Sequence, residues 1–128
     1  MRIAITSSGP ELDAPFDPRF GRAAYFIIFD EETQTWQAHP NPAVEAPGGA
    51  GIQAAQFIAN QGVAAIVSGD FGPNAYRALS AANIAMYLAP RGEPLPVRQL
   101  VEQYRMGNLQ PVFEPTQRGH YGRTMGTR

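Results

Sequence analysis

The 128-residue sequence contains no cysteine and no lysine. Without cysteine the chain can form neither structural disulfides nor zinc or iron–sulfur centres held by thiolates. A metal would have to be held by the two histidines, His39 and His120, by methionine, carboxylates or backbone groups, or arrive with its own ligands. All ten basic residues are arginine, so an anion site here uses planar donors that can form two hydrogen bonds at once.

Long apolar runs and a strong net charge are also missing. No run approaches the ~20 residues of a membrane helix, and the strand-like start differs from a secretory leader. We therefore expect no membrane partner and a cytoplasmic location. The formal net charge of −1 argues against nucleic-acid binding by the domain as a whole. The apolar and charged fractions, 44% and 16%, are those of a globular protein of one-domain size.

What the sequence does contain is an alternation of β-prone and helix-periodic segments. Strands are expected at residues 2–6, 24–29, 35–39, 63–68 and 84–88, and helices at residues 52–61, 73–82 and 96–106. With right-handed crossovers, the order β-β-β-α-β-α-β-α predicts an α/β fold: three α/β/α layers around a five-stranded mixed sheet. Residues 1–110 are expected to form the domain. Residues 111–128, rich in Gly and Arg, are expected to be a flexible tail, either solvated or an arginine-bearing arm for a partner or an anionic ligand.

Three glycine-containing loops should meet at one edge of this sheet, where open α/β sheets bind their ligands. They cover residues 7–22, 48–51 and 69–74. Two helix N-termini, with partial positive charge on free backbone N–H groups, should point at this edge, so we predict a site for an anion. The candidate binding residues are Ser7, Ser8, Arg19, Phe20, Gly21, Arg22, Gly48, Gly49, Ala50, Gly51, Gly69, Asp70, Gly72 and Asn74.

Each of these signals also has a purely structural interpretation. The glycines at 48–51 could serve only a tight helix start, since they match neither the phosphate-loop ending Gly-Lys-Ser/Thr nor the Gly-x-Gly-x-x-Gly spacing. His39, at a strand end, is a weak candidate metal ligand and more often a structural residue, and His120 lies in the predicted tail.

Catalysis has little support in the sequence. There is no cysteine nucleophile and no Gly-x-Ser-x-Gly elbow. The topology resembles ribonuclease H-like folds, whose chemistry needs clustered carboxylates around metal ions, yet the first strand has no acidic residue. Asp13, Asp17 and Asp70 could approach the edge, although Asp17 before Pro18 is also typical of a turn. We therefore expect a protein that is not an enzyme, with metal-dependent hydrolysis the least favoured alternative.

Five segments together resemble one family. They are RIAITS (2–7), RFGRAAYF (19–26), NP (41–42), GGAGIQAA (48–55) and SGDFGPNA (68–75), in the order typical of the dinitrogenase iron–molybdenum cofactor biosynthesis proteins, which include NifX, NafY and the C-terminal domain of NifB. The resemblance implies a ribonuclease H-like fold without nuclease activity. It also implies a carrier or chaperone for an anionic metal–sulfur cluster, such as the iron–molybdenum cofactor or its precursor. Because the family also has members outside nitrogen fixation, the resemblance does not identify the pathway in which this protein acts.

Two positions depart from the family pattern. Arg19 and Gly48 stand where relatives commonly have histidine. Both changes remove a potential metal ligand, whereas the arginine keeps positive charge for noncovalent binding. Two functions therefore remain open: a carrier whose partners are the metallocofactor and a cofactor-assembly or acceptor enzyme, or a ligand-free interaction module of the same fold that docks on a partner enzyme.

Overall fold

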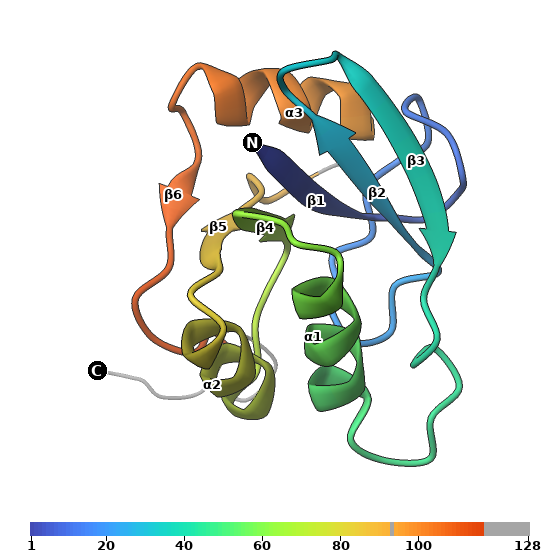
Figure 1. Ribbon diagram of the computed structural model, residues 1–128, viewed down its shortest axis with the longest axis vertical. Coiled ribbons are helices and arrows are strands. Elements are labelled where there is room, and N and C mark those ends of the chain that lie inside the picture. The colour runs from blue at the N-terminus through green and yellow to red at the C-terminus, as the bar shows by residue number, and fades with distance from the viewer. Residues whose placement is uncertain (93, 117–128) are drawn as a thin grey trace.

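The computed structural model describes residues 1–92 and 94–116, which form six strands and three helices (Figure 1). The strands are β1 (Arg2–Ser7), β2 (Tyr25–Asp30), β3 (Thr35–Pro40), β4 (Ala65–Ser68), β5 (Ala85–Leu88) and β6 (Gln110–Pro111). The helices are α1 (Ala50–Asn60), α2 (Pro73–Ala81) and α3 (Val97–Arg105). This part of the chain contains no helix long and apolar enough to cross a membrane.

All six strands belong to one mixed sheet with the order β3-β2-β1-β4-β5-β6. β1 pairs antiparallel with β2 and parallel with β4, and β4 continues parallel to β5. β2 and β3 form the expected hairpin. The predicted α/β class is confirmed, but the sheet has six strands rather than five. β6 was missed because a two-residue strand that contains Pro111 shows neither alternation nor β-propensity.

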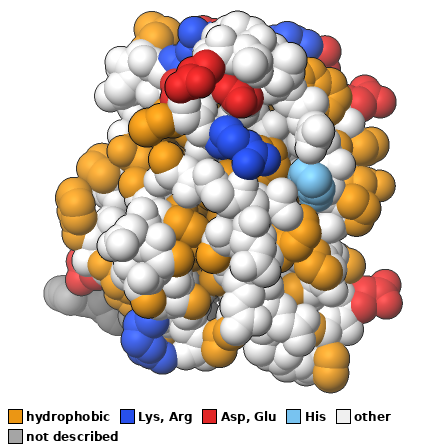
Figure 2. Space-filling view, in the orientation of Figure 1, with side chains coloured by type: hydrophobic (Ala, Val, Ile, Leu, Met, Phe, Trp, Pro, Cys, Tyr) orange, Lys and Arg blue, Asp and Glu red, His pale blue; other side chains and the backbone are white. Residues whose placement is uncertain are grey.

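Helices cover both faces of the sheet, α3 on one side and α1 with α2 on the other (Figure 1). The alternation of β1 shows why two cores form: Ile3 and Ile5 belong to the cluster that includes Leu100 of α3, and Ala4 between them belongs to the cluster of α1 and α2. Charged side chains gather in one view over α3 and the β2–β3 turn, whereas the surface over α1 and α2 is largely hydrophobic or uncharged (Figure 2).

The chain continues along the domain beyond the boundary predicted at residue 110. Val112 is buried and donates its N–H to the carbonyl of Met86 in β5 at 2.9 Å. The hydroxyl of Tyr76 in α2 then donates to the carbonyl of Phe113 at 2.7 Å. Residues 111–116 of the predicted tail thus include the end of β6 and form hydrogen bonds to β5, to α2 and to the loop after β4. Its remaining part, residues 117–128 with His120, lies outside the described residues.

Candidate functional site

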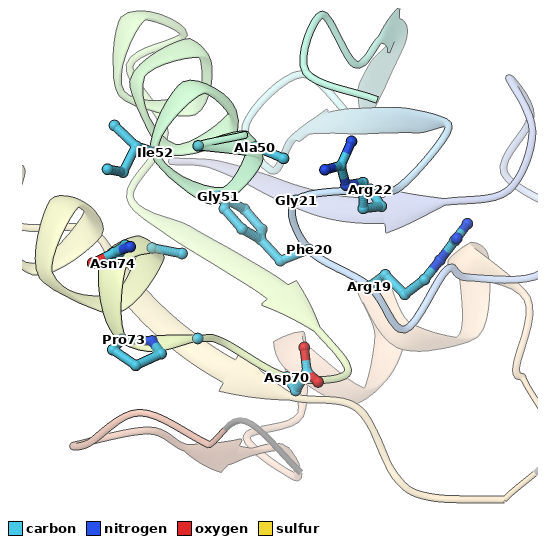
Figure 3. A pocket seen from close by; sticks show the side chains of 13 residues that line it. Arg19, Phe20, Gly21, Arg22, Ala50, Gly51, Ile52, Asp70, Pro73 and Asn74 are labelled. Atoms are coloured by element: carbon cyan, nitrogen blue, oxygen red, sulfur yellow. The ribbon is translucent and has the colours of Figure 1, made fainter. Parts of the chain in front are cut away.

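A pocket of about 340 Å³ lies between the N-termini of α1 and α2, beside the loop of residues 19–22 (Figure 3). It brings together most of the predicted loop residues: Arg19, Phe20, Gly21, Arg22, Gly49, Ala50, Gly51, Asp70, Gly72 and Asn74. It also includes Ile52, Pro73 and Ala75, which the sequence reasoning missed. The signal that could have found them is their position in the first turn of helices whose N-termini were predicted to face this edge.

Neither helix N-terminus at the pocket carries a side-chain cap or an acidic residue in its first turn. The N-cap residues are Gly49, in the left-handed conformation at φ 70°, and Gly72. Ser, Thr, Asp or Asn at these positions would accept hydrogen bonds from the first amides of the helix. With glycine there, these amides stay open to a ligand.

The amides of the first helical turns are therefore the main donors of the pocket. Intrahelical bonding begins with Gln53 N–H to Gly49 C=O at 3.0 Å in α1, and with Tyr76 N–H to Gly72 C=O at 2.9 Å in α2. The preceding N–H groups have no acceptor within their own helix. They belong to Ala50, Gly51, Ile52, Asn74 and Ala75, all of which line the pocket.

Two glycines allow these main-chain segments to approach each other. A Cβ at Gly21 would lie 3.0 Å from the nitrogen of Gly51, and a Cβ at Gly51 would lie 3.3 Å from the Cβ of Ala75. Both distances are shorter than an ordinary carbon contact of ~3.5 Å or more. Glycine at 21 and 51 therefore holds the loop, α1 and α2 close enough to share one pocket.

Phe20 forms an apolar part of the pocket lining and is held in place by core aromatic residues. The residue is 2% exposed, and its ring contacts those of Phe26 in β2 and Phe71 at centroid distances of 5.7 and 5.6 Å. Phe20, which directly follows Arg19, is thereby anchored in the core, and this anchoring fixes the course of the loop beside α1.

Arg19 lines the pocket, but its guanidinium is occupied by Asp17. Its Nε and Nη2 donate to the two carboxylate oxygens at 3.1 and 3.0 Å, and its backbone N–H donates to Oδ1 at 3.0 Å. The hydrogen bonds and charge of Asp17 raise the pKa of Arg19. Figure 3 shows the Arg19 side chain extending away from Phe20 and Asp70. Arg19 therefore offers the pocket little uncompensated charge.

The positive charge of Arg22, unlike that of Arg19, is not neutralised by a neighbouring carboxylate among the described residues. Its Nη1 donates to the carbonyls of Val44 and Ala46 at 3.1 and 2.7 Å, which ties down the segment that leads into α1. Within residues 1–92 and 94–116, no carboxylate lies within 4.0 Å of the Arg22 guanidinium. Buried Asn41 supports the same region by donating to the carbonyls of Gly21 and Ala23 at 3.1 and 2.9 Å.

Asp70 brings negative charge to the same pocket. Its backbone forms a bridge to that of Arg19, and Figure 3 shows its carboxylate on the pocket side of the loop after β4. The electrostatic character of the pocket thus results from opposing groups: open amides and Arg22 favour an anion, and Asp70 disfavours one.

Four predicted binding residues do not line the pocket. The Ser7 hydroxyl bonds to the backbone of Gly9, and the Ser8 hydroxyl donates to the carbonyl of Pro15 at 2.7 Å. Gly48 lies outside the lining, with space for a Cβ. Gly69 packs against Pro18, whose Cα would lie 2.6 Å from an added Cβ. These residues shape or join the loops that hold the pocket.

His39, the weak metal candidate, lies on β3 and not in the pocket lining. Its ring meets the edge of Phe57 in α1 at a centroid distance of 5.8 Å. Its Nε2 is buried and has no hydrogen-bond partner among the described residues. In this part of the chain, no group of three or more His, Cys, Asp or Glu side chains could hold a metal ion.

Comparisons with known proteins identify relatives of this chain in sequence and in fold. Residues 1–107 match the family model described as dinitrogenase iron-molybdenum cofactor. The apo form of the orange protein from Desulfovibrio gigas superposes with a TM-score of 0.84 at 41% identity, over 89% of this chain and 94% of that one.

Two further relatives cover most of the chain. A Thermotoga protein provisionally described as a NifB protein, of the DUF35 family, has a TM-score of 0.74 at 32% identity, over 88% of this chain and 95% of that one. Protein MJ0580 of Methanocaldococcus jannaschii is 33% identical over 92 residues, which are 70% of this chain and 75% of that protein.

Proposed function

Because this chain belongs to the dinitrogenase iron-molybdenum cofactor family, we propose that it is a non-enzymatic carrier of an anionic metal–sulfur cluster. The cargo is the iron–molybdenum cofactor, a precursor of it, or a related iron–sulfur or molybdenum–sulfur cluster. It binds noncovalently in the pocket between α1 and α2. The observation that carries this proposal is the convergence of two uncapped helix N-termini on one pocket.

The donor set suits a cluster that arrives with its own ligands. Sulfide and carboxylate groups on the outside of such a cluster accept hydrogen bonds, and the first-turn amides of α1 and α2 donate them in the direction of the helix dipoles. The apolar side chains of Ile52 and Pro73 contact the less polar parts of the cargo. The chain has no thiolate with which to replace a cluster ligand. Binding is therefore outer-sphere and reversible.

The acidic residues considered for hydrolysis are dispersed. Asp17 is bound to Arg19, and Asp13 pairs with Arg98 of α3 at 2.9 Å. Of the three, only Asp70 lines the pocket. Two-metal hydrolysis needs several carboxylates around ions ~3.5–4 Å apart. This arrangement supports binding rather than catalysis.

One observation favours the second candidate, an interaction module that docks on a cofactor-assembly or acceptor enzyme without holding a ligand. The Asp17–Arg19 pair and the Asp70 carboxylate leave little net positive charge on the side chains of the pocket. If the amides alone bind a cluster too weakly, the pocket still offers a concave surface with hydrogen-bonding groups to which a protein partner can dock.

The deciding experiment incubates the purified protein with isolated iron–molybdenum cofactor or with tetrathiomolybdate at low salt, followed by gel filtration and metal analysis. The carrier proposal expects molybdenum to co-elute with the protein at micromolar concentration and to dissociate at high salt. If molybdenum co-elutes with the protein for neither of the two probes, the carrier proposal is refuted. A stoichiometric complex with an acceptor enzyme that persists in Arg22→Gln, without any bound metal, would establish the interaction module instead.

A further inference from the structure

The two edges of the sheet are built differently. β6, at one edge, has two residues and includes Pro111, whereas β3, at the other edge, has six residues. Proteins protect exposed edge strands from pairing with other chains by keeping them short or by placing charges or proline on them. Residues 33–41, which include the whole of β3, contain no Asp, Glu or Arg, and Pro40 comes only at the end of the strand. β3 is therefore the edge that remains open to a further strand (Figure 1).

The hydrogen-bond pattern shows which main-chain groups of β3 point outward. One pair beyond the end of β3, the N–H of Asn41 donates to the carbonyl of Ala24 at 3.0 Å. Because bonded and non-bonded pairs alternate along an antiparallel ladder, β3 bonds to β2 through residues 35, 37 and 39. The N–H and C=O groups of Trp36 and Ala38 therefore point away from β2. The described part of the chain provides no hydrogen-bond partner for them.

The side chains of the same two residues leave apolar surface at this edge. Trp36 and Ala38 lie on the α3 side of the sheet, since their partners in β2, Phe29 and Ile27, belong to the core cluster that includes Leu100 of α3. Trp36 is 38% exposed, so a large ring remains partly open to solvent beside the unpaired main-chain groups. Tryptophan is among the residues that contribute most when an interface buries them.

A second, antiparallel copy of β3 fits this edge about a two-fold axis at Gln37. In this register Trp36 of each copy lies opposite Ala38 of the other, and the N–H and C=O groups of both residues all find partners. An axis at Ala38 would instead place the Trp36 carbonyl opposite Pro40, which has no N–H to donate. The two-fold axis at Gln37 therefore uses the outward groups of β3 completely.

The side chains of β3 are also complementary to themselves in this register. The large ring of Trp36 meets the small side chain of Ala38 on the α3 side, and the two Gln37 side chains lie opposite each other on the other side, where their amides can hydrogen-bond. Because residues 33–41 contain no Asp, Glu or Arg, two identical strands meet without repulsion, and a charged peptide finds no opposite charge there. These features favour a second copy of this chain over a charged partner.

We propose that β3 is a dimerisation edge, at which two copies of this chain join their six-stranded sheets into one continuous sheet through antiparallel β3 strands centred on Gln37. The interface is independent of the proposed carrier function. β3 runs toward the pocket, because the loop after it leads into the N-terminus of α1. The antiparallel arrangement therefore places the two pockets at opposite edges of the joint sheet and leaves both of them open.

The test is sedimentation equilibrium of the full-length protein from micromolar to millimolar concentration, where a monomer–dimer equilibrium is expected. Gln37→Lys and Gln37→Glu each place like charges opposite each other at the axis, and each should weaken dimerisation by about 3- to 10-fold. An equimolar mixture of the two variants places opposite charges there and should form a mixed dimer at least as strong as that of the unmodified protein. Gln110→Lys, the same substitution on the exposed β6 edge, is the matched control and should leave dimerisation unchanged.

Ala38→Pro tests the main-chain bonds directly. It removes an N–H that points outward and is not used in the pairing with β2, so the monomer should keep its circular dichroism spectrum and its affinity for tetrathiomolybdate while dimerisation is lost. A protein that stays monomeric up to millimolar concentration would overturn the dimer. A dimer that Ala38→Pro leaves intact, or one that the mixture of the two Gln37 variants fails to restore, would overturn pairing through β3 about Gln37. None of these outcomes bears on tetrathiomolybdate binding, so the carrier function is decided separately.

Discussion

Gly21→Ala tests whether main-chain amides hold the cargo. The added methyl would lie 3.0 Å from the nitrogen of Gly51 and 3.2 Å from the carbonyl carbon of Ala50, both in the first turn of α1. Gly21 is not among the glycines with positive φ, so alanine costs no backbone strain. The change therefore acts through crowding against the main chain of Ala50 and Gly51.

The magnitude follows from two opposing terms. Crowding of this kind costs ~1–3 kcal/mol, and the smaller entropy of the unfolded chain returns ~0.4–1 kcal/mol. We expect the free energy of unfolding to fall by about 0.5–2 kcal/mol. Binding should suffer more, because the methyl covers the N–H of Gly51. A hydrogen bond to a charged group is worth ~1.5–3 kcal/mol, which corresponds to a loss of about 10- to 100-fold in affinity.

Gly48→Ala is the matched control. A Cβ there meets no atom within 4 Å, the residue has no positive φ, and it does not line the pocket. It should bind tetrathiomolybdate like the unmodified protein and be equally or slightly more stable in urea unfolding. The reasoning is refuted if Gly21→Ala keeps full affinity, or if both variants lose it to the same degree.

Two further substitutions test the electrostatics. Arg19→Gln should lower the free energy of unfolding by ~1–2 kcal/mol, because the buried Asp17 carboxylate loses two hydrogen bonds to a largely exposed guanidinium. The affinity for tetrathiomolybdate should change less than about threefold. A large loss of affinity with unchanged stability would contradict the conclusion that Arg19 serves Asp17 rather than the ligand. Burial, with a contribution from the charge of Glu31, raises the pKa of Tyr104. The folded pKa of Tyr104 thus exceeds the value of about 10 for an unfolded chain. The stability that Tyr104 contributes through this shift is therefore complete below pH 10 and is lost as pH rises through the folded pKa. Tyr104→Phe should therefore flatten the alkaline fall in stability between pH 9 and 11, measured by urea unfolding, and an unchanged slope would exclude Tyr104 as its source.

The fold could be predicted from sequence because its main signals are local. The run at 24–29 is β-prone throughout, and the apolar run that ends at Ser68 is typical of a strand buried on both faces, as β4 is. β6 could not be predicted, because its two residues are held by pairing with β5 rather than by their own propensity. The same holds for residues 112–116, whose position depends on partners about 26 to 45 residues away in the sequence.

The location of the pocket was predictable, but the roles of its charged groups were not. Parallel strands bring the loops to one edge, and this follows from topology alone. Whether Arg19 turns to a ligand or to Asp17 depends on side-chain packing. The sequence did hold a signal: Asp17-Pro18-Arg19 forms a turn in which Oδ1 of Asp17 accepts the Arg19 N–H at 3.0 Å, which places the two side chains together.

The glycine caps of α1 and α2 have a consequence for how such a site can be mapped. A donor that belongs to the main chain remains when its side chain is cut back to alanine, and Ala50 and Ala75 are alanine already. Alanine scanning of this pocket would therefore report on its side chains and would miss the main-chain amides. Substitutions that add atoms, rather than remove them, are the ones that reveal a binding site of this construction.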